Sequence, residues 1–194
     1  MLKGIFLRSH LLLEAAAANY VWTENLMQVA IAALLSMVPT FEGRYAIVAM
    51  LGMGMPAGFA YILAVVFSTL PMPIILLLLR PVLDWFYTLP IKPVRAFAAW
   101  LEKRSEKKRA KMHANQGTGV RGWLSKHVSQ DTIELIGLYI FVALPLPGTG
   151  CWTGSAVATL FEMPRLKAAL VITLGNITAC AIMLAATMGV ISIF

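Results

Sequence analysis

Apolar residues dominate two parts of the chain, and proline and glycine interrupt the first apolar stretch of each part. The first part covers residues 23–88 and the second covers residues 130–194. In each part, a longer apolar segment follows the interrupted stretch and exceeds the roughly 20 residues that a helix needs to cross a bilayer. The pattern predicts two repeats, each made of a re-entrant helical hairpin and a transmembrane helix.

The first interruption has the sequence Pro39-Thr-Phe-Glu-Gly-Arg-Tyr45 and contains two charged residues inside an apolar stretch. On a continuous helix, Glu42 and Arg44 would point to different faces and could not pair, because they are only two positions apart. A turn between two short helices is therefore the more economical interpretation. Pro56 then begins the first transmembrane helix, in a position that proline favours, and a proline pair further along predicts a kink.

The second interruption, Pro145-Leu-Pro-Gly-Thr-Gly-Cys-Trp-Thr-Gly154, lies within an apolar run from about residue 133 to residue 161. Backbone groups freed by such a break are tolerated in a bilayer only when they pack in protein or line a wet cavity. Aligning Pro39 with Pro145 and Pro56 with Pro164 superposes hairpin on hairpin and transmembrane helix on transmembrane helix.

The order of these elements predicts how the repeats are inserted. A hairpin leaves the membrane on the side it entered, and the helix after it crosses to the other side, so the second repeat is upside down relative to the first. Inverted repeats with interrupted helices place a substrate site near the midplane, between the repeats. We therefore expect an all-α integral membrane protein with a single membrane domain over residues 1–194.

Two more polar segments accompany the repeats. Residues 1–22 mix apolar and charged side chains and predict an amphipathic helix at the membrane interface. Residues 89–129 form a basic linker with a predicted helix, and ten of the sixteen Lys and Arg lie between Lys92 and Lys126. The positive-inside rule places this linker in the cytoplasm, with both termini on the opposite face.

The composition is typical of a membrane protein: 59% of the residues are apolar and 13% are charged, against about 45–50% and about 25% in soluble proteins. The net charge of +7 comes without a nucleic-acid recognition motif, so attraction to anionic lipid headgroups is the better interpretation. Cys151 and Cys180 lack metal-binding or disulfide spacing. The histidines lie in interfacial or cytoplasmic segments, away from any cysteine or carboxylate pair, so neither an enzyme nor a cofactor is expected.

Glu42 and Arg44 are the charged residues that lie well inside an apolar stretch. Burying a charge in hydrocarbon is expensive, so such residues are functional by default. We expect them to bind substrate or to couple its movement to protons. The alternative is that Arg44 pairs with Glu42 or caps backbone carbonyls and only holds the hairpin together, and both interpretations can hold at once.

The second interruption suggests an anion site. The N–H groups of Gly148, Thr149 and Gly150, followed by a helix N-terminus, are expected to form a concavity that suits an anion. The alternative is close packing of one hairpin tip against the other through small residues. Supporting roles are expected for further residues of both repeats. Pro39, Pro145 and Pro147 are expected to break helices, and Trp152 is expected to be a packing anchor. Ser68 and Asn176 lie at matching positions of the transmembrane helices and are expected to hydrogen-bond the broken hairpin backbones or to coordinate substrate.

Three segments resemble the small multidrug export protein family: Phe41-Glu-Gly-Arg-Tyr-Ala-Ile47, Leu70-Pro-Met-Pro73 and the tip from Pro145 to Gly154. The likeness covers residues from about 32 to 190, although Val48 and Ser68 stand where the family often has proline and asparagine. The family is regarded as a distant relative of the DedA membrane proteins. The resemblance implies a prokaryotic inner-membrane protein with two re-entrant hairpins and a transport role. The DedA relatives are linked to undecaprenyl phosphate recycling and to proton-dependent drug resistance.

These observations lead to one hypothesis and one alternative. The hypothesis is a transporter or lipid translocase that moves a drug-like or lipid-phosphate substrate through a midplane site. In it, Arg44 binds an anionic group and Glu42 takes part in proton coupling. Membrane lipids are then partners, and the short chain is either a minimal carrier or half of a homo-oligomer. The alternative is a membrane scaffold or accessory subunit that transports nothing.

Overall fold

The computed structural model describes residues 25–88 and 129–191, together with part of the segment 90–107. The predicted interfacial helix over residues 1–22 and most of the basic linker over residues 89–129 lie outside the described residues. The positions described between residues 92 and 107 are helical and exposed. Within the described ranges the chain is all-helical and contains no strand, as the sequence pattern predicts.

The described helices form two pairs of short helices and two long segments. In chain order they are α2 (Leu26–Met37), α3 (Glu42–Gly52), α4 (Ala57–Thr69), α5 (Pro71–Thr88), α8 (Gln130–Ala143), α9 (Cys151–Leu160) and α10 (Arg165–Ile191). We call α2 and α3 the first pair, joined by the first tip (residues 38–41). We call α8 and α9 the second pair, joined by the second tip (residues 144–150). The long segments are α4 followed by α5, and α10.

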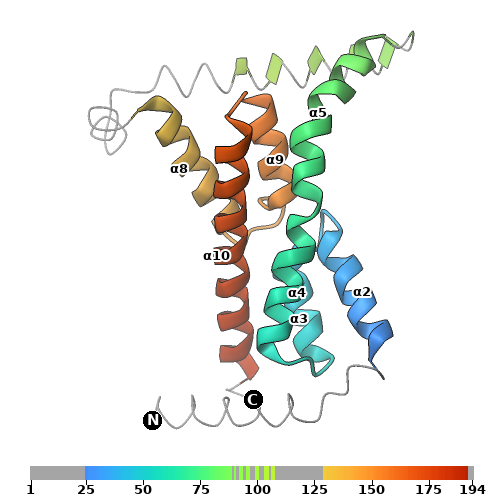
Figure 1. Ribbon diagram of the computed structural model, residues 1–194, viewed down its shortest axis with the longest axis vertical. Coiled ribbons are helices and arrows are strands. Elements are labelled where there is room, and N and C mark those ends of the chain that lie inside the picture. The colour runs from blue at the N-terminus through green and yellow to red at the C-terminus, as the bar shows by residue number, and fades with distance from the viewer. Residues whose placement is uncertain are drawn as a thin grey trace.

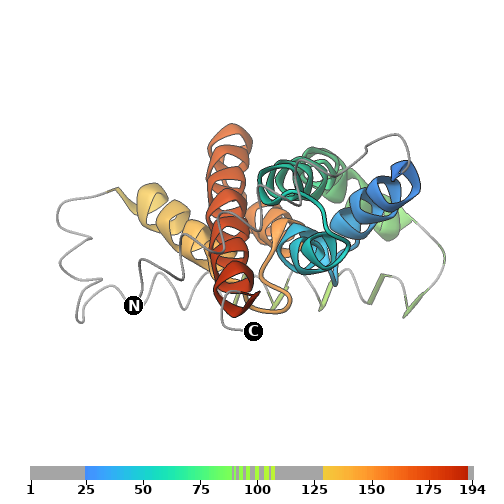
Figure 2. The same ribbon diagram turned by 90° about the horizontal axis from the view of Figure 1, so that it is seen from below.

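Each short pair turns back about halfway along the bundle, and the two pairs come from opposite ends of it (Figure 1). The two tips therefore lie next to each other, and residues 100 positions apart in the sequence are in contact. Seen along the bundle (Figure 2), α2 and α8 lie at the two outer edges, whereas α3, α9 and α10 lie between them.

The second break is shorter than the sequence predicts. The helix α9 begins at Cys151, so the last part of the proline- and glycine-rich motif is helical. Gly154, expected in the break, lies buried within α9, where a Cβ atom would be 2.7 Å from Val142 Cγ2. This glycine therefore serves close helix packing. The chain reversal depends instead on Gly148, which has a φ of 78°, a conformation that side chains disfavour.

Two segments are long and apolar enough to cross a membrane: Ala57–Thr88, with a mean hydropathy of 2.6, and Arg165–Val190, with a mean hydropathy of 2.1. The first is interrupted between α4 and α5, at the predicted proline pair, because Pro71 and Pro73 have no N–H group for a helix hydrogen bond. The helix α5 continues past Arg80 and ends at Thr88.

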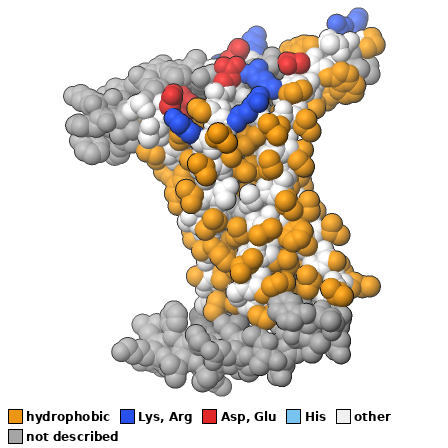
Figure 3. Space-filling model, viewed as in Figure 1, with side chains coloured by type: hydrophobic (Ala, Val, Ile, Leu, Met, Phe, Trp, Pro, Cys, Tyr) orange, Lys and Arg blue, Asp and Glu red, His pale blue; other side chains and the backbone are white. Residues whose placement is uncertain are grey.

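Large apolar side chains cover the outside of the bundle between its two ends (Figure 3). Along α10, the exposed ones include Leu166, Leu170, Leu174, Ile177 and Ile182. The Lys, Arg, Asp and Glu side chains visible in this view gather at one end, near α5 and the beginning of α10. We call this the charged end. The visible face of the bundle thus carries an apolar band with charge at one end of it.

The two short pairs finish in the same backbone motif. Gly54 and Glu162 have positive φ angles, 79° and 56°, and the N–H of each donates to a carbonyl three residues back. In both, the N–H of the following methionine donates to a carbonyl five residues back, which is the pattern of a Schellman motif. Pro56 and Pro164 come next, and each long helix begins directly after its proline.

Candidate functional site

Glu42 and Arg44 form a buried ion pair at the beginning of α3. Arg44 Nη2 lies 3.4 Å from Glu42 Oε2, and the two residues are 1% and 4% exposed, respectively. The expectation that residues two positions apart cannot pair holds only inside a regular helix. Glu42 is the first residue of α3 and has a φ of 48°, so its side chain leaves the helical direction and turns toward Arg44.

The guanidinium group of Arg44 reaches out of its own repeat and into the second tip. Nη1 donates to the carbonyl oxygens of Leu144 at 2.9 Å and Leu146 at 3.4 Å and to Thr149 Oγ1 at 3.1 Å. Nη2 donates to the carbonyl oxygens of Val142 at 3.3 Å and Thr149 at 3.5 Å. The last carbonyls of a helix have no partner within it, and a positive charge is favourable at that end. Arg44 therefore caps the C-terminus of α8.

The carboxylate of Glu42 occupies the opposite end of the same break. The Trp152 backbone N–H donates to Glu42 Oε1 at 3.4 Å, in the first turn of α9, where a negative charge is favourable. A Cβ atom on Gly150 would overlap this carboxylate, so glycine allows the close approach. The sequence suggests that the N-terminus of α9 binds an anion from outside the protein. In the structure, this N-terminus faces the Glu42 carboxylate of the first repeat.

The two tips are tied together in both directions. The Trp152 indole Nε1 donates to the Met37 carbonyl, the last of α2, at 2.9 Å. The Tyr45 hydroxyl donates to the Pro145 carbonyl at 3.5 Å. Thr149 Oγ1 lies 2.8 Å from the Leu144 carbonyl oxygen and accepts from Arg44. We call Glu42, Arg44 and the second tip the junction. Trp152 lies there as an anchor between the pairs, the interpretation that the sequence favours, and Pro39 and Pro147 lie in the turns of the two tips.

Ser68 and Asn176 meet each other and not the tips. Asn176 Nδ2 donates to Ser68 Oγ at 2.7 Å and to Thr69 Oγ1 at 3.1 Å, and Ser68 Oγ donates to the Ala64 carbonyl of its own helix at 2.6 Å. They do not hydrogen-bond the broken hairpin backbones as expected, because Arg44 bonds the carbonyls at the end of α8 and Trp152 bonds the last carbonyl of α2. They join α4 to α10 where the long helices cross. Thr69, which sequence reasoning missed, shares this cluster.

Arg44 Nε is buried and has no hydrogen-bond partner within the described part of the chain. The other two guanidinium nitrogens, Nη1 and Nη2, both contact oxygen atoms of the second repeat, and Nη2 also pairs with Glu42. A buried donor without a partner is uncommon and marks a place where a further acceptor is favourable. Arg44 Nε is therefore the one guanidinium nitrogen whose hydrogen-bonding capacity the described residues leave unused.

The described part of the chain is thus a helical bundle with two apolar segments of membrane-spanning length and with a buried ion pair between two opposed helix pairs. The model of one family, described as "putative small multi-drug export protein", matches residues 42–182. This is more than half of the chain, and the protein belongs to that family. The junction and Trp152 both lie inside the matched range.

The family and the two long apolar segments together indicate a membrane protein, and an export role indicates a transporter rather than an enzyme. Neither the comparison with curated proteins nor the comparison with solved structures gives a match. The relationship to the DedA proteins stays a prediction from the sequence motifs.

Proposed function

We propose that the protein is a transporter of the prokaryotic cytoplasmic membrane, with two re-entrant hairpins that enter the bilayer from opposite faces. The apolar band (Figure 3) supports this placement, because large exposed apolar surfaces on a helical bundle match a lipid environment. The charged end is then the cytoplasmic one, since the basic linker follows α5 directly and carries most of the Lys and Arg. In this placement the tips lie near the midplane.

One observation carries the proposal: the charged junction is the point where the two repeats hold each other. Arg44 and Glu42 come from the first repeat, and the helix ends that they cap belong to the second. If the repeats move apart, both helix ends lose their caps and both charges lose their surroundings. Separation is therefore unfavourable unless an anion replaces the lost acceptors of Arg44 or a proton neutralises Glu42. Movement is thereby coupled to binding.

This coupling suggests the order of events. When the repeats separate, Arg44 binds an anionic group of the substrate and Glu42 takes up a proton, so that no bare charge is left at the midplane. Release of substrate and proton on the other face lets the junction form again. Such alternation around a fixed site between inverted repeats is how many secondary transporters work. Arg44 Nε, which lacks a partner in the closed junction, is available to the substrate.

The substrate class is a small or amphiphilic molecule. The description of the family favours a drug-like compound, whereas the buried Arg44 favours an anionic group such as a lipid phosphate. The second candidate is a scaffold or accessory subunit. The same observation supports it, because a junction that satisfies both helix ends also makes a rigid structure.

Transport assays in proteoliposomes separate the two candidates. A fluorescent lipophilic cation and a fluorescent phospholipid report drug export and lipid translocation, with and without a pH gradient. We expect Glu42→Gln and Arg44→Lys to abolish transport. Glu106→Gln and Arg104→Lys, which make the same chemical changes at exposed positions, should leave it intact. If the purified protein moves neither probe, or if the junction variants transport normally, the transporter proposal fails and the scaffold remains.

A further inference from the structure

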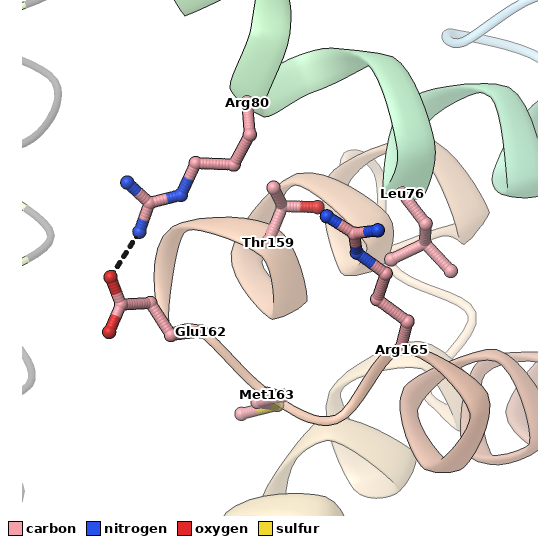
Figure 4. A pocket seen from close by; sticks show the side chains of 6 residues that line it. All are labelled: Leu76, Arg80, Thr159, Glu162, Met163 and Arg165. Atoms are coloured by element: carbon pink, nitrogen blue, oxygen red, sulfur yellow. Dashed lines mark hydrogen bonds and ion pairs between the residues drawn. The ribbon is translucent and has the colours of Figure 1, made fainter.

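A second polar site lies away from the junction, at the charged end of the bundle. It is a pocket of about 390 Å³ between α5, the end of α9 and the beginning of α10. Its walls are formed by Leu76, Arg80, Thr159, Glu162, Met163 and Arg165. Figure 4 shows that the two arginines enter it from different helices, Arg80 from α5 and Arg165 from the first residue of α10.

The pocket has an excess of positive charge. Arg80 pairs with Glu162, and their side chains are 35% and 60% exposed. Arg165 has no hydrogen bond or ion pair to any residue in the described ranges, and Lys167 lies exposed two positions further on. The first turn of α10 contains no acidic residue, so the positive end of the helix dipole is not neutralised there. Two arginines, a helix N-terminus and one carboxylate thus meet in one pocket.

Glu162 stands where the first repeat has glycine. Both residues occupy the positive-φ position of the same motif, and Gly54 fits it without cost. Glutamate at a φ of 56° is strained. Strain of this kind persists at functional sites. In the second repeat its effect is to place a carboxylate against Arg80 at the mouth of the pocket (Figure 4). A glycine would form the turn more easily but would leave Arg80 without this partner.

The pocket also has an apolar side. Leu76 and Met163 lie in its wall and are 5% and 8% exposed, and Thr159 adds a hydroxyl group next to them. In the proposed placement the charged end lies at the membrane surface, where a phosphate would be in water and an attached hydrocarbon chain in lipid. Arginine forms paired hydrogen bonds with phosphate oxygens, and helix N-termini bind phosphate.

We infer that this pocket binds the phosphate group of an amphiphile, with Arg80, Arg165 and the N-terminus of α10 around the phosphate and with Leu76 and Met163 against the first apolar atoms. In this inference Glu162 acts as an internal anion that holds Arg80 in place through their ion pair. The phosphate replaces Glu162 as the partner of Arg80 when it binds. The inference rests on the membrane placement proposed above and does not depend on transport.

Binding is measured on the purified full chain in detergent micelles, by native mass spectrometry and by the shift of the melting temperature. The probes are dioleoyl phosphatidic acid, dioleoyl phosphatidylcholine, glycerol 3-phosphate and inorganic phosphate. We expect phosphatidic acid to bind more tightly than phosphatidylcholine. Arg165→Ala should weaken its binding by about tenfold, the effect of losing charged hydrogen bonds. Arg104→Ala removes the same charge from a position outside the pocket and should change binding little.

Two further results decide the source of the phosphate and the role of Glu162. Weak binding of glycerol 3-phosphate and inorganic phosphate assigns the pocket to a lipid. Binding of these probes as tightly as phosphatidic acid, still dependent on Arg165, assigns it to a water-soluble phosphate. Glu162→Gly, which keeps the turn and removes the internal anion, should tighten binding. If no probe binds, if Arg104→Ala weakens binding as much as Arg165→Ala, or if Glu162→Gly weakens it, the inference is overturned. These assays measure binding only, whereas the proteoliposome assays measure transport. A failure of this inference can therefore be distinguished from a failure of the transporter proposal.

Discussion

Removing the charge of Glu42 should cost the protein a large part of its stability. Glutamine has nearly the same shape and can still accept the Trp152 N–H, so Glu42→Gln removes little except the charge. Arg44 then keeps a buried positive charge without a counter-ion, since it is 1% exposed. Breaking a buried ion pair on one side costs about 3–5 kcal/mol, whereas an exposed pair contributes about 0–1 kcal/mol.

We expect a loss of about 3 kcal/mol, at the lower end of this range, because five oxygen atoms of the second repeat still surround the guanidinium. Arg44→Met should cost more, about 4–5 kcal/mol, because it leaves Glu42 unpaired and also frees the carbonyls at the end of α8. The double variant contains neither charge. Its loss should be smaller than the sum of the single losses by about 1–3 kcal/mol.

The assay is reversible unfolding in mixed micelles with a rising fraction of sodium dodecyl sulfate, followed by circular dichroism. Glu106→Gln is the matched control, since it makes the same change on an exposed side chain, and should alter the free energy of unfolding by less than about 0.5 kcal/mol. A loss below about 1 kcal/mol for Glu42→Gln would show that the pair is solvated. Strictly additive losses in the double variant would show that the two charges do not interact. Either result refutes the description of the junction.

Two other substitutions test the packing around the junction and the crossing of the long helices, in the same unfolding assay. Gly150→Ala should destabilise the protein by about 1–3 kcal/mol, because the added Cβ overlaps the Glu42 carboxylate. The control Gly137→Ala adds a Cβ in open space within α8 and should be neutral or stabilising. Equal effects of the two substitutions would contradict the close approach of Glu42 to Gly150. Asn176→Ala should cost about 0.6–1.7 kcal/mol through the lost bonds to Ser68 and Thr69, and an unchanged free energy of unfolding would show that these bonds contribute nothing.

Much of the fold is determined locally and could be predicted from the sequence. Helix formation follows from long apolar stretches, and the breaks follow from residues that cannot continue a helix. Pro56 is predicted to begin a long helix and lies one residue before it, as Pro164 does in the second repeat, and the pair Pro71 and Pro73 interrupts the first of these helices. The errors are at boundaries: α9 begins at Cys151, because glycine within a helix can serve packing as well as chain reversal.

The sequence alone also showed that Glu42 and Arg44 need partners, since charges in an apolar stretch cannot stay unpaired. It could not show which partners they have. The carbonyls of Val142 and Leu144 and the first turn of α9 look like any other backbone in the sequence, and their contacts with Arg44 and Glu42 span about 100 positions. The sequence analysis left the pairing of Glu42 with Arg44 open as one of two interpretations, because the left-handed conformation of Glu42, which allows the pair, is not visible in a pattern of polar and apolar residues.

What the sequence determined by itself is therefore the set of elements and the need for a charged site. The elements are two pairs of short helices and two long apolar segments, and the charged site contains one acid and one base directly after the first tip. Only the tertiary structure decided that this acid and base cap the two ends of the other repeat's broken helix, and that Glu162 meets Arg80 in a pocket with Arg165. The physical reason is range. Helix propensity and helix breaks depend on neighbours along the chain, whereas hydrogen bonds and ion pairs between repeats depend on how the completed helices pack.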